Sequence, residues 1–298
     1  MTLAAGESES EGTIPANDLM QESADIETSS EDYARRFAGP VGEYFLDVQA
    51  RATLDLVRPW PGARALEIGG GHAQVAVPLV RHGYRVTVSG SDESCRARLD
   101  RFLPAGSFEF IRCDMLRLPF PNRHFDLVLA YRLLPHVERW TDLIREMCRV
   151  ARTAVVVDYP DIRSFNAVQR MFFGWKRAIE QNTRPFRCFR RRDLVSEFAR
   201  HGFGDPAWRH EFFFPMVIHR AAGSAVFSRG LETVPRLLGL TRAFGSPVIL
   251  RVTCHREDSS PCAASLLSES RNSHRRAGTG RGPSGGRSRG RPADIPRR

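Results

Sequence analysis

The alternation of strand-like apolar runs with helical patterns between residues 40 and 160 constrains the fold of this chain more than any other feature. Five apolar runs have the length of strands, and segments with helical spacing separate them: 63–68, 85–89, 108–113, 125–130 and 154–158. Parallel strands need long crossover connections, which are usually helices. The order therefore predicts βαβ units and a doubly wound, mostly parallel sheet of the α/β class.

The second half of the chain has a less regular pattern. It predicts, in order, helices at 165–179 and 191–203, a strand near 207–214, a helical insertion at about 217–242 and a last strand at 247–254. These segments would complete the same domain.

The two ends differ in composition from the rest of the chain. Residues 1–32 contain nine acids and no Lys or Arg, with few apolar residues, which predicts a disordered acidic arm. The last 28 residues contain nine Arg among Gly, Ser and Pro, and we expect a disordered Arg/Gly-rich tail over 257–298. One folded domain over 33–256 remains.

The net charge of +10 has two interpretations. A basic surface favours a polyanionic partner, but Lys176 is the single lysine among 44 basic residues, as a GC-rich coding sequence would give. Six widely spaced cysteines without a C-x-x-C pair indicate neither a disulfide framework nor a metal site. We find no N-terminal signal and no apolar run long enough for a transmembrane segment, so we expect a cytoplasmic protein with reduced thiols.

The segment ALEIGGGHAQ, residues 65–74, contains three glycines where a strand must turn into a helix. Such a turn lets a ligand approach the backbone and the unpaired N–H groups of the next helix. A dinucleotide fingerprint would need a third glycine where Gln74 stands. Glu67, two residues before Gly69, would repel a pyrophosphate and suits a ligand with a cationic end.

This turn and the segments that follow resemble the class I S-adenosylmethionine (SAM)-dependent methyltransferases. The turn is similar to their E/D-x-G-x-G motif, and FIRCDMLRLPFPNRHFDLVLAYRLLPHV and LIREMCRVARTAVVVDYP are similar to their later motifs. The resemblance covers about residues 60–160 and is nearest to small-molecule enzymes of ubiquinone and menaquinone biosynthesis. It implies a Rossmann-like, seven-stranded sheet with an antiparallel last strand, and SAM as cofactor.

By position, the resemblance implies that six residues form the cofactor site. Glu67, Gly69 and Gly71 would hold the amino-acid end of SAM, Asp114 and Met115 would contact the adenine, and Tyr131 would line the methionine side. One position departs from the family. Where the family has an acid for the ribose hydroxyls, at the end of the second strand, this chain has Gly90. Asp92 or Ser91 would take its place, and Asp92 also fits the N-cap of the next helix.

His136 is the candidate catalytic residue. It follows the fourth strand at the edge where open α/β sheets bind ligands, and it would act as a general base if the acceptor arrives protonated. A packing or helix-capping role is the alternative. No base-flipping (D/N/S)-P-P-(Y/F) element follows that strand, and the Pro-Cys pair at 261–262 lies outside the sheet, so a nucleic-acid substrate is disfavoured.

A small organic acceptor is therefore expected. Two further interpretations stay open: an RNA-associated methyltransferase recruited by the basic tail, and a methyltransferase-like binding module without catalysis. An NAD-dependent oxidoreductase fits least, because of Glu67 and the missing glycine. The sequence does not indicate an oligomeric state.

Overall fold

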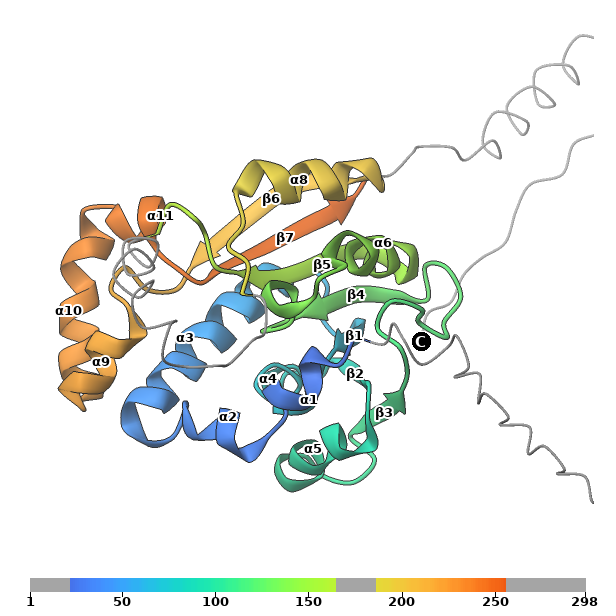
Figure 1. The fold of residues 1–298 in the computed structure, drawn as a ribbon, viewed down its shortest axis with the longest axis horizontal. Coiled ribbons are helices and arrows are strands. Elements are labelled where there is room, and N and C mark those ends of the chain that lie inside the picture. Colours follow the sequence, from blue (N-terminus) through green and yellow to red (C-terminus); the bar gives the residue numbers. More distant parts are fainter. Residues whose placement is uncertain (1–21, 165–185, 256–298) are drawn as a thin grey trace, which may run out of the picture. The chain divides into compact units, whose positions relative to one another are not determined.

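The structure is a computed structural model that describes residues 22–164 and 186–255 (Figure 1). Within these residues one sheet has the strand order β3-β2-β1-β4-β5-β7-β6. Its strands are β1 Arg64–Ile68, β2 Arg85–Gly90, β3 Phe108–Arg112, β4 Phe125–Ala130, β5 Ala151–Tyr159, β6 Phe203–His210 and β7 Val248–Cys254. Strand β7 runs antiparallel to both of its neighbours, whereas the other pairs are parallel. The prediction of a doubly wound, seven-stranded sheet with an antiparallel last strand is confirmed.

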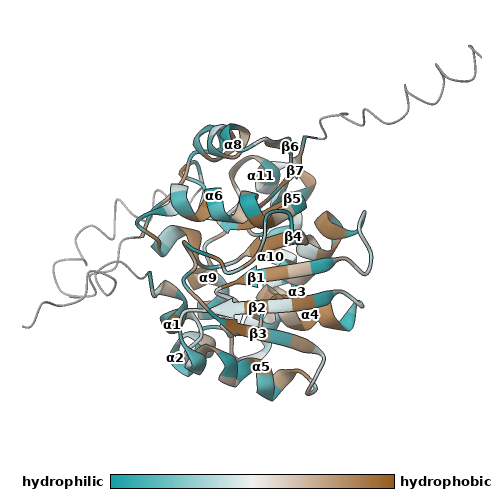
Figure 2. Ribbon diagram, turned by 90° about the vertical axis from the view of Figure 1, so that its right-hand side faces the viewer, coloured by the Kyte–Doolittle hydropathy of each residue, from teal (hydrophilic) through white to brown (hydrophobic). Residues whose placement is uncertain are grey.

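Both faces of the sheet are apolar, which explains why its central strands are continuous hydrophobic runs. Leu66 and Val128 point to the face covered by α6 (Trp140–Val150) and α8 (Arg191–Arg200). Their neighbours Ala65 and Leu127 point to the other face, under α3 (Gly39–Val57), α4 (Ala76–Arg81) and α5 (Ala97–Phe102). Figure 2 shows brown, apolar residues along the strands and teal residues on the outer helices.

The N-terminal boundary of the fold lies earlier in the chain than the sequence predicts. Residues 22–32 were expected to be part of a disordered arm, but α1 (Ala24–Thr28) and α2 (Glu31–Arg35) contain fully or largely buried residues such as Asp25 and Tyr33. Ser30 caps α2 by accepting a hydrogen bond from the Tyr33 backbone N–H at 3.2 Å. Acid-rich composition alone therefore misassigned these residues. The rest of the arm, the predicted helix at 165–179 and the tail lie outside the described residues.

The last third of the domain departs from the expected pattern in one place. Strand β6 begins and ends about four residues earlier than the predicted strand at 207–214. It begins early because Phe203 and Gly204 already pair with Cys254 and Thr253 of β7. It ends early because the backbone N–H groups of Phe213 and Phe214 donate to the carboxylate of Glu232, at 2.9 and 3.0 Å. The predicted helical insertion comprises α9 (Met216–Ala222), α10 (Ala225–Leu237) and α11 (Leu240–Phe244). No helix in the described ranges is long and apolar enough to cross a membrane.

Candidate active site

The glycine turn connects β1 to a 3-10 helix, η1 (Gly70–His72). Gly69 adopts the left-handed conformation with a φ of 67°, and its N–H donates to the Ser89 carbonyl of β2 at 2.8 Å. A side chain at Gly70 would come within 2.5 Å of the Glu67 carboxyl carbon. At Gly71 it would clash with Ser29, the residue after α1, and with the Cys95 backbone. Backbone geometry and close neighbours thus both require glycine in this turn.

Glu67 is the buried acid beside these glycines. Neither carboxylate oxygen accepts a hydrogen bond of normal geometry within the described part of the chain, although the Ala76 backbone N–H partly offsets the cost of burying the charge. Burial raises the pKa of Glu67 well above its ordinary value. His72 lies 3.6 Å away but stays neutral, because burial and the charge of Arg132 lower its pKa to about 3. Glu67 is therefore a carboxyl group that a cationic ligand would stabilise in its charged form.

At the end of β2, the structure shows the capping role of Asp92, and its role toward the cofactor stays a prediction. The Asp92 side chain accepts a hydrogen bond from the Ser94 backbone N–H at 2.9 Å and caps the 3-10 helix η2 (Glu93–Arg96). A hydrogen bond from Ser94 is the main reason that the pKa of Asp92 is lowered. A different carboxylate occupies the end of the strand: Asp25 of α1 accepts hydrogen bonds from the backbone N–H and the hydroxyl of Ser91.

Asp114 and Met115 follow β3, as the sequence predicts. Asp114 is half-buried, and its Oδ1 accepts a hydrogen bond from the Leu116 N–H at 2.8 Å, so it shapes its own turn. Met115 is buried in the apolar cluster that also contains Leu133 and Ala24. These contacts are compatible with an adenine-binding turn, but they would form without adenine as well. The adenine role of both residues therefore stays a prediction.

Tyr131 lies differently from what the resemblance implies. Its side chain is fully buried beneath α3, where its hydroxyl lies 2.7 Å from Thr53 Oγ1. Burial is the main cause of its strongly raised pKa. Its backbone carbonyl is the part near the turn, 3.4 Å from His72 Nε2. The backbone of Tyr131 therefore borders the predicted cofactor site, while its phenol packs into the core.

A cluster of polar side chains lies at the carboxyl ends of β4, β5 and β6, and sequence reasoning missed most of it. Arg132 donates its backbone N–H to Asp158 Oδ1 at 2.7 Å, and its Nε lies 3.6 Å from Asp158 Oδ2. The guanidinium also donates to Gln49 Oε1 of α3 at 2.6 Å. Glu211 follows β6 and is completely buried. We call Gln49, Arg132, Asp158 and Glu211 the edge cluster.

The two carboxyl groups of the edge cluster have raised pKa values, and several of its polar atoms are unpaired. Burial raises the pKa of Glu211 to about 8, with Arg132 acting against the shift and Asp158 adding to it. Burial also raises the pKa of Asp158, again opposed by Arg132. Gln49 Nε2, Arg132 Nε and both Glu211 oxygens make no hydrogen bond among the residues described. Unpaired polar atoms of this kind are costly in a core and are typical of a site that binds a polar ligand.

His136 ends a short 3-10 helix, η3 (Leu134–His136), after β4, where the sequence predicts it. It is half-buried, and its ring centroid lies 5.6 Å from that of Phe186. No group of three or more His, Cys, Asp or Glu side chains within 22–164 and 186–255 has the geometry of a metal site. The structure therefore leaves His136 at the expected edge without testing its catalytic role.

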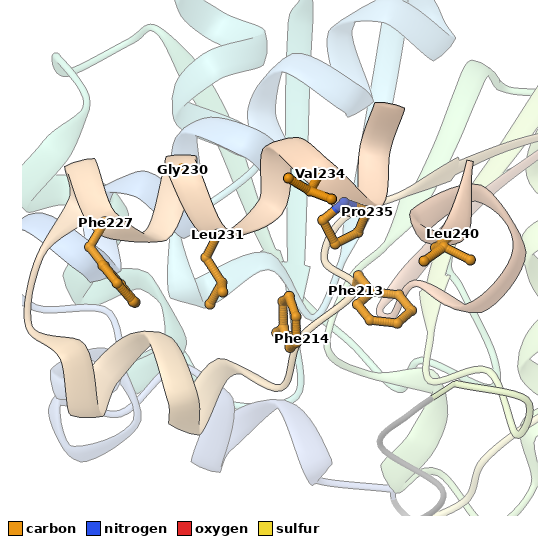
Figure 3. A pocket seen from close by; sticks show the side chains of 8 residues that line it. All are labelled: Phe213, Phe214, Phe227, Gly230, Leu231, Val234, Pro235 and Leu240. Carbon is orange, nitrogen blue, oxygen red and sulfur yellow. The ribbon is translucent and has the colours of Figure 1, made fainter. Parts of the chain in front are cut away.

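Two cavities flank this region. One, of about 770 Å³, borders the glycine turn through His72, Ala73 and Gln74 and extends between α2, α3 and α5. The other, of about 640 Å³, lies between α10 and the chain after β6, with an apolar lining that includes Phe213, Phe214 and Phe227 (Figure 3). No lining residue of the second cavity is titratable or belongs to the glycine turn.

Comparison with known proteins agrees with this geometry. Residues 66–156 match the family model described as a methyltransferase domain. The ubiquinone/menaquinone biosynthesis C-methyltransferase of Pseudomonas putida (strain GB-1) is 34% identical over 109 residues, which are 34% of this chain and 43% of that protein. Its counterpart from Ectopseudomonas oleovorans is 33% identical over 109 residues, 34% of this chain and 64% of that protein. The chain thus matches less than two thirds of the length of these relatives.

Solved structures share the fold. A SAM-dependent methyltransferase from Thermotoga maritima, a possible histamine N-methyltransferase, superposes with a TM-score of 0.52 at 17% identity, covering 77% of this chain and 98% of that one. Magnesium protoporphyrin IX methyltransferase from Synechocystis PCC 6803, with bound S-adenosylhomocysteine, gives 0.52 at 16% identity, covering 77% and 97%. From the motifs, the matched family model and the strand order together, the chain carries a class I SAM-dependent methyltransferase domain.

Proposed function

We propose that this protein transfers a methyl group from SAM to a small organic acceptor. The observation that carries the proposal is Glu67, a buried carboxyl without a hydrogen-bond partner of normal geometry, set beside a glycine turn that excludes side chains. A cationic amino group would supply the missing partner, and SAM ends in one. Glu67, Gly69 and Gly71 would hold this end of the cofactor, with Asp114 and Met115 near the adenine.

The acceptor side of the proposal rests on the edge cluster. Bound SAM supplies an electrophilic methyl group, so the protein must mainly hold the acceptor close to it and in line. Arg132 and Gln49 each offer an unpaired donor, and Glu211 offers a carboxyl group that remains protonated at neutral pH because its pKa is about 8. These groups fit an uncharged acceptor with hydroxyl or carbonyl oxygens.

The cofactor is tested by calorimetric titration of S-adenosylhomocysteine, the expected product, into the full chain, with NAD as the control ligand. We expect micromolar binding of S-adenosylhomocysteine and none of NAD. Gly69→Arg should weaken binding by more than roughly 100-fold, because residue 69 has a positive φ and a Cβ there would lie 3.1 Å from Asp25 Cβ and Leu133. Binding that survives in a folded Gly69→Arg variant, or no binding in the wild type, would contradict the proposal.

His136 is tested separately once an acceptor screen gives turnover. If it is a general base, His136→Ala should lower kcat by roughly 100-fold at neutral pH and leave the Kd of S-adenosylhomocysteine unchanged. The matched control is His124→Ala, since His124 precedes β4 at the opposite edge of the sheet, where it lies 2.7 Å from Arg64 Nη2. Equal turnover in the two variants would remove His136 from the mechanism.

The same experiments address the other two interpretations. Tight cofactor binding without turnover across a broad acceptor screen would favour a non-catalytic binding module. An RNA-associated enzyme would bind RNA in a salt-sensitive way and lose that binding without its tail. That interpretation rests on the arginine-rich sequence of residues 257–298 alone.

A further inference from the structure

The end of β2 cannot carry the acid that the family uses for the ribose. A Cβ at Gly90 would come within 2.8 Å of Cys95 Cβ and 3.1 Å of the Phe110 ring. Cys95 belongs to the segment after β2, and Phe110 belongs to the neighbouring strand β3. The backbone of both residues is therefore held in place, and neither side chain can move away freely. Asp92, the nearest acid in the sequence, is engaged in capping η2. In the structure, the carboxylate at this position comes from another part of the chain, from Asp25.

Asp25 brings such a carboxylate to the end of β2. It is completely buried, its Oδ2 accepts from the Ser91 backbone N–H at 2.6 Å, and its Oδ1 accepts from the Ser91 hydroxyl at 2.5 Å. The Cys95 thiol lies 3.7 Å from Oδ2. Since an ionised carboxylate has about four acceptor positions, these donors leave room for a further hydroxyl. Asp25 is therefore held in a fixed orientation without being saturated.

The remaining contacts of α1 surround the same site. Asp25 Cβ lies 3.1 Å from where a Cβ at Gly69 would be, and Ser29 abuts Gly71. Ala24 is part of the apolar cluster that contains Met115. The preceding Glu22 accepts from the backbone N–H of Glu138 and Arg139, at 3.0 and 3.2 Å. Helix α1 and the flanking residues Glu22 and Ser29 thus lie along the turn after β1, the end of β2, the loop after β3 and the start of α6.

We propose that Asp25 is the residue that binds the ribose hydroxyls of the cofactor, in place of the acid that Gly90 excludes. This inference rests on the proposed function, because it presumes that SAM binds at the glycine turn. A vicinal diol offers two O–H donors, and a carboxylate fixed by Ser91 accepts from them. Because Asp25 and Ser29 lie directly on the turn, cofactor entry requires α1 to shift away from the glycines.

The test is calorimetric titration of the full-length wild type, Asp25→Asn, Asp92→Asn and Asp100→Asn with S-adenosylhomocysteine and with its 2′-deoxy and 3′-deoxy analogues. Asp25→Asn keeps the shape of the side chain and one acceptor oxygen for Ser91. We expect it to weaken S-adenosylhomocysteine binding by roughly 10- to 100-fold, the range for losing a hydrogen bond to a charged group. Asp100→Asn, an exposed change on α5, is the matched control and should bind like the wild type. A loss of affinity in Asp92→Asn together with wild-type affinity in Asp25→Asn would assign the ribose hydroxyls to Asp92 and overturn the inference.

The deoxy analogues identify the group that Asp25 contacts. The wild type should lose affinity when a hydroxyl is removed, whereas Asp25→Asn should lose much less, because the two changes remove the same interaction. Equal losses in both proteins, or unchanged or tighter binding to Asp25→Asn, would overturn the inference; tighter binding would mean that Asp25 competes with the cofactor. Thermal melting of each variant confirms folding. If the wild type does not bind at all, the proposed function fails instead.

Discussion

Glu211→Gln should unfold at a higher urea concentration than the wild type at pH 8, and at nearly the same concentration at pH 4.5. Burial raises the pKa of Glu211 from 4.5 to about 8, so between these values the folded protein keeps a proton that the unfolded chain has released. The wild type therefore loses stability as pH rises, by about 1.4 kcal/mol per pH unit for one proton, levelling off above the folded pKa. Glutamine does not titrate and avoids this loss, so the variants should differ by a few kcal/mol at pH 8.

Burial of Glu211 sets the size of the effect, and the charged groups that face it modify its pKa. Arg132 lowers its pKa and Asp158 raises it, and the Arg236 guanidinium donates to the Glu211 backbone carbonyl at 3.2 Å. Urea unfolding of wild type, Glu211→Gln and the control Glu43→Gln, an exposed change on α3, should be measured from pH 4.5 to 9. Parallel stability curves for all three proteins would show that Glu211 does not hold its proton, and the acceptor chemistry proposed for it would lose its basis.

The parts of the fold that follow from local patterns could be predicted from the sequence. Strand β4 and helix α6 are marked by apolar periodicity, and their order dictates a parallel sheet. The glycine turn could be placed for the same reason, since a strand, an acid and three glycines are adjacent in the chain. Glu67, Gly69 and Gly71 accordingly lie together, and His136 lies at the expected edge.

The contacts that the sequence does not reveal join distant residues. Asp25 meets Ser91 across 66 positions, and Arg132 meets Gln49 across 83. Composition even argued against a role for Asp25, because it lies in an acidic stretch that lacks apolar periodicity. Tyr131 illustrates a further limit: its position after β4 was predictable, but the packing of α3 decides that its phenol bonds to Thr53. Burial and side-chain direction come from tertiary packing, which single-sequence patterns do not encode.

Glu232 links the helical insertion to the edge of the sheet through hydrogen bonds. It is completely buried on α10, and its carboxylate accepts from the backbone N–H groups of Phe213 and Phe214 and lies 3.1 Å from His219 Nε2 of α9. One side chain thereby joins the chain after β6 to two helices of the insertion. The same stretch positions Glu211, which precedes Phe213 by two residues. Loss of Glu232 should therefore disturb the edge cluster as well as the insertion.

Glu232→Leu is expected to lower the free energy of unfolding by about 3–5 kcal/mol, because it leaves His219 buried without this carboxylate and removes the acceptor of two half-buried backbone N–H groups. Thr233→Ala, the next residue on the exposed face of α10, removes a hydrogen bond to the Arg229 carbonyl and should cost less than about 1 kcal/mol. Urea unfolding gives both values, and hydrogen exchange should show faster opening of α9 and α10 in Glu232→Leu. A cost no larger than that of Thr233→Ala would mean that water satisfies these groups. The insertion would then be held by its apolar contacts alone, such as those of Met216 and Ala225 with the cluster that contains Phe45 and Phe212.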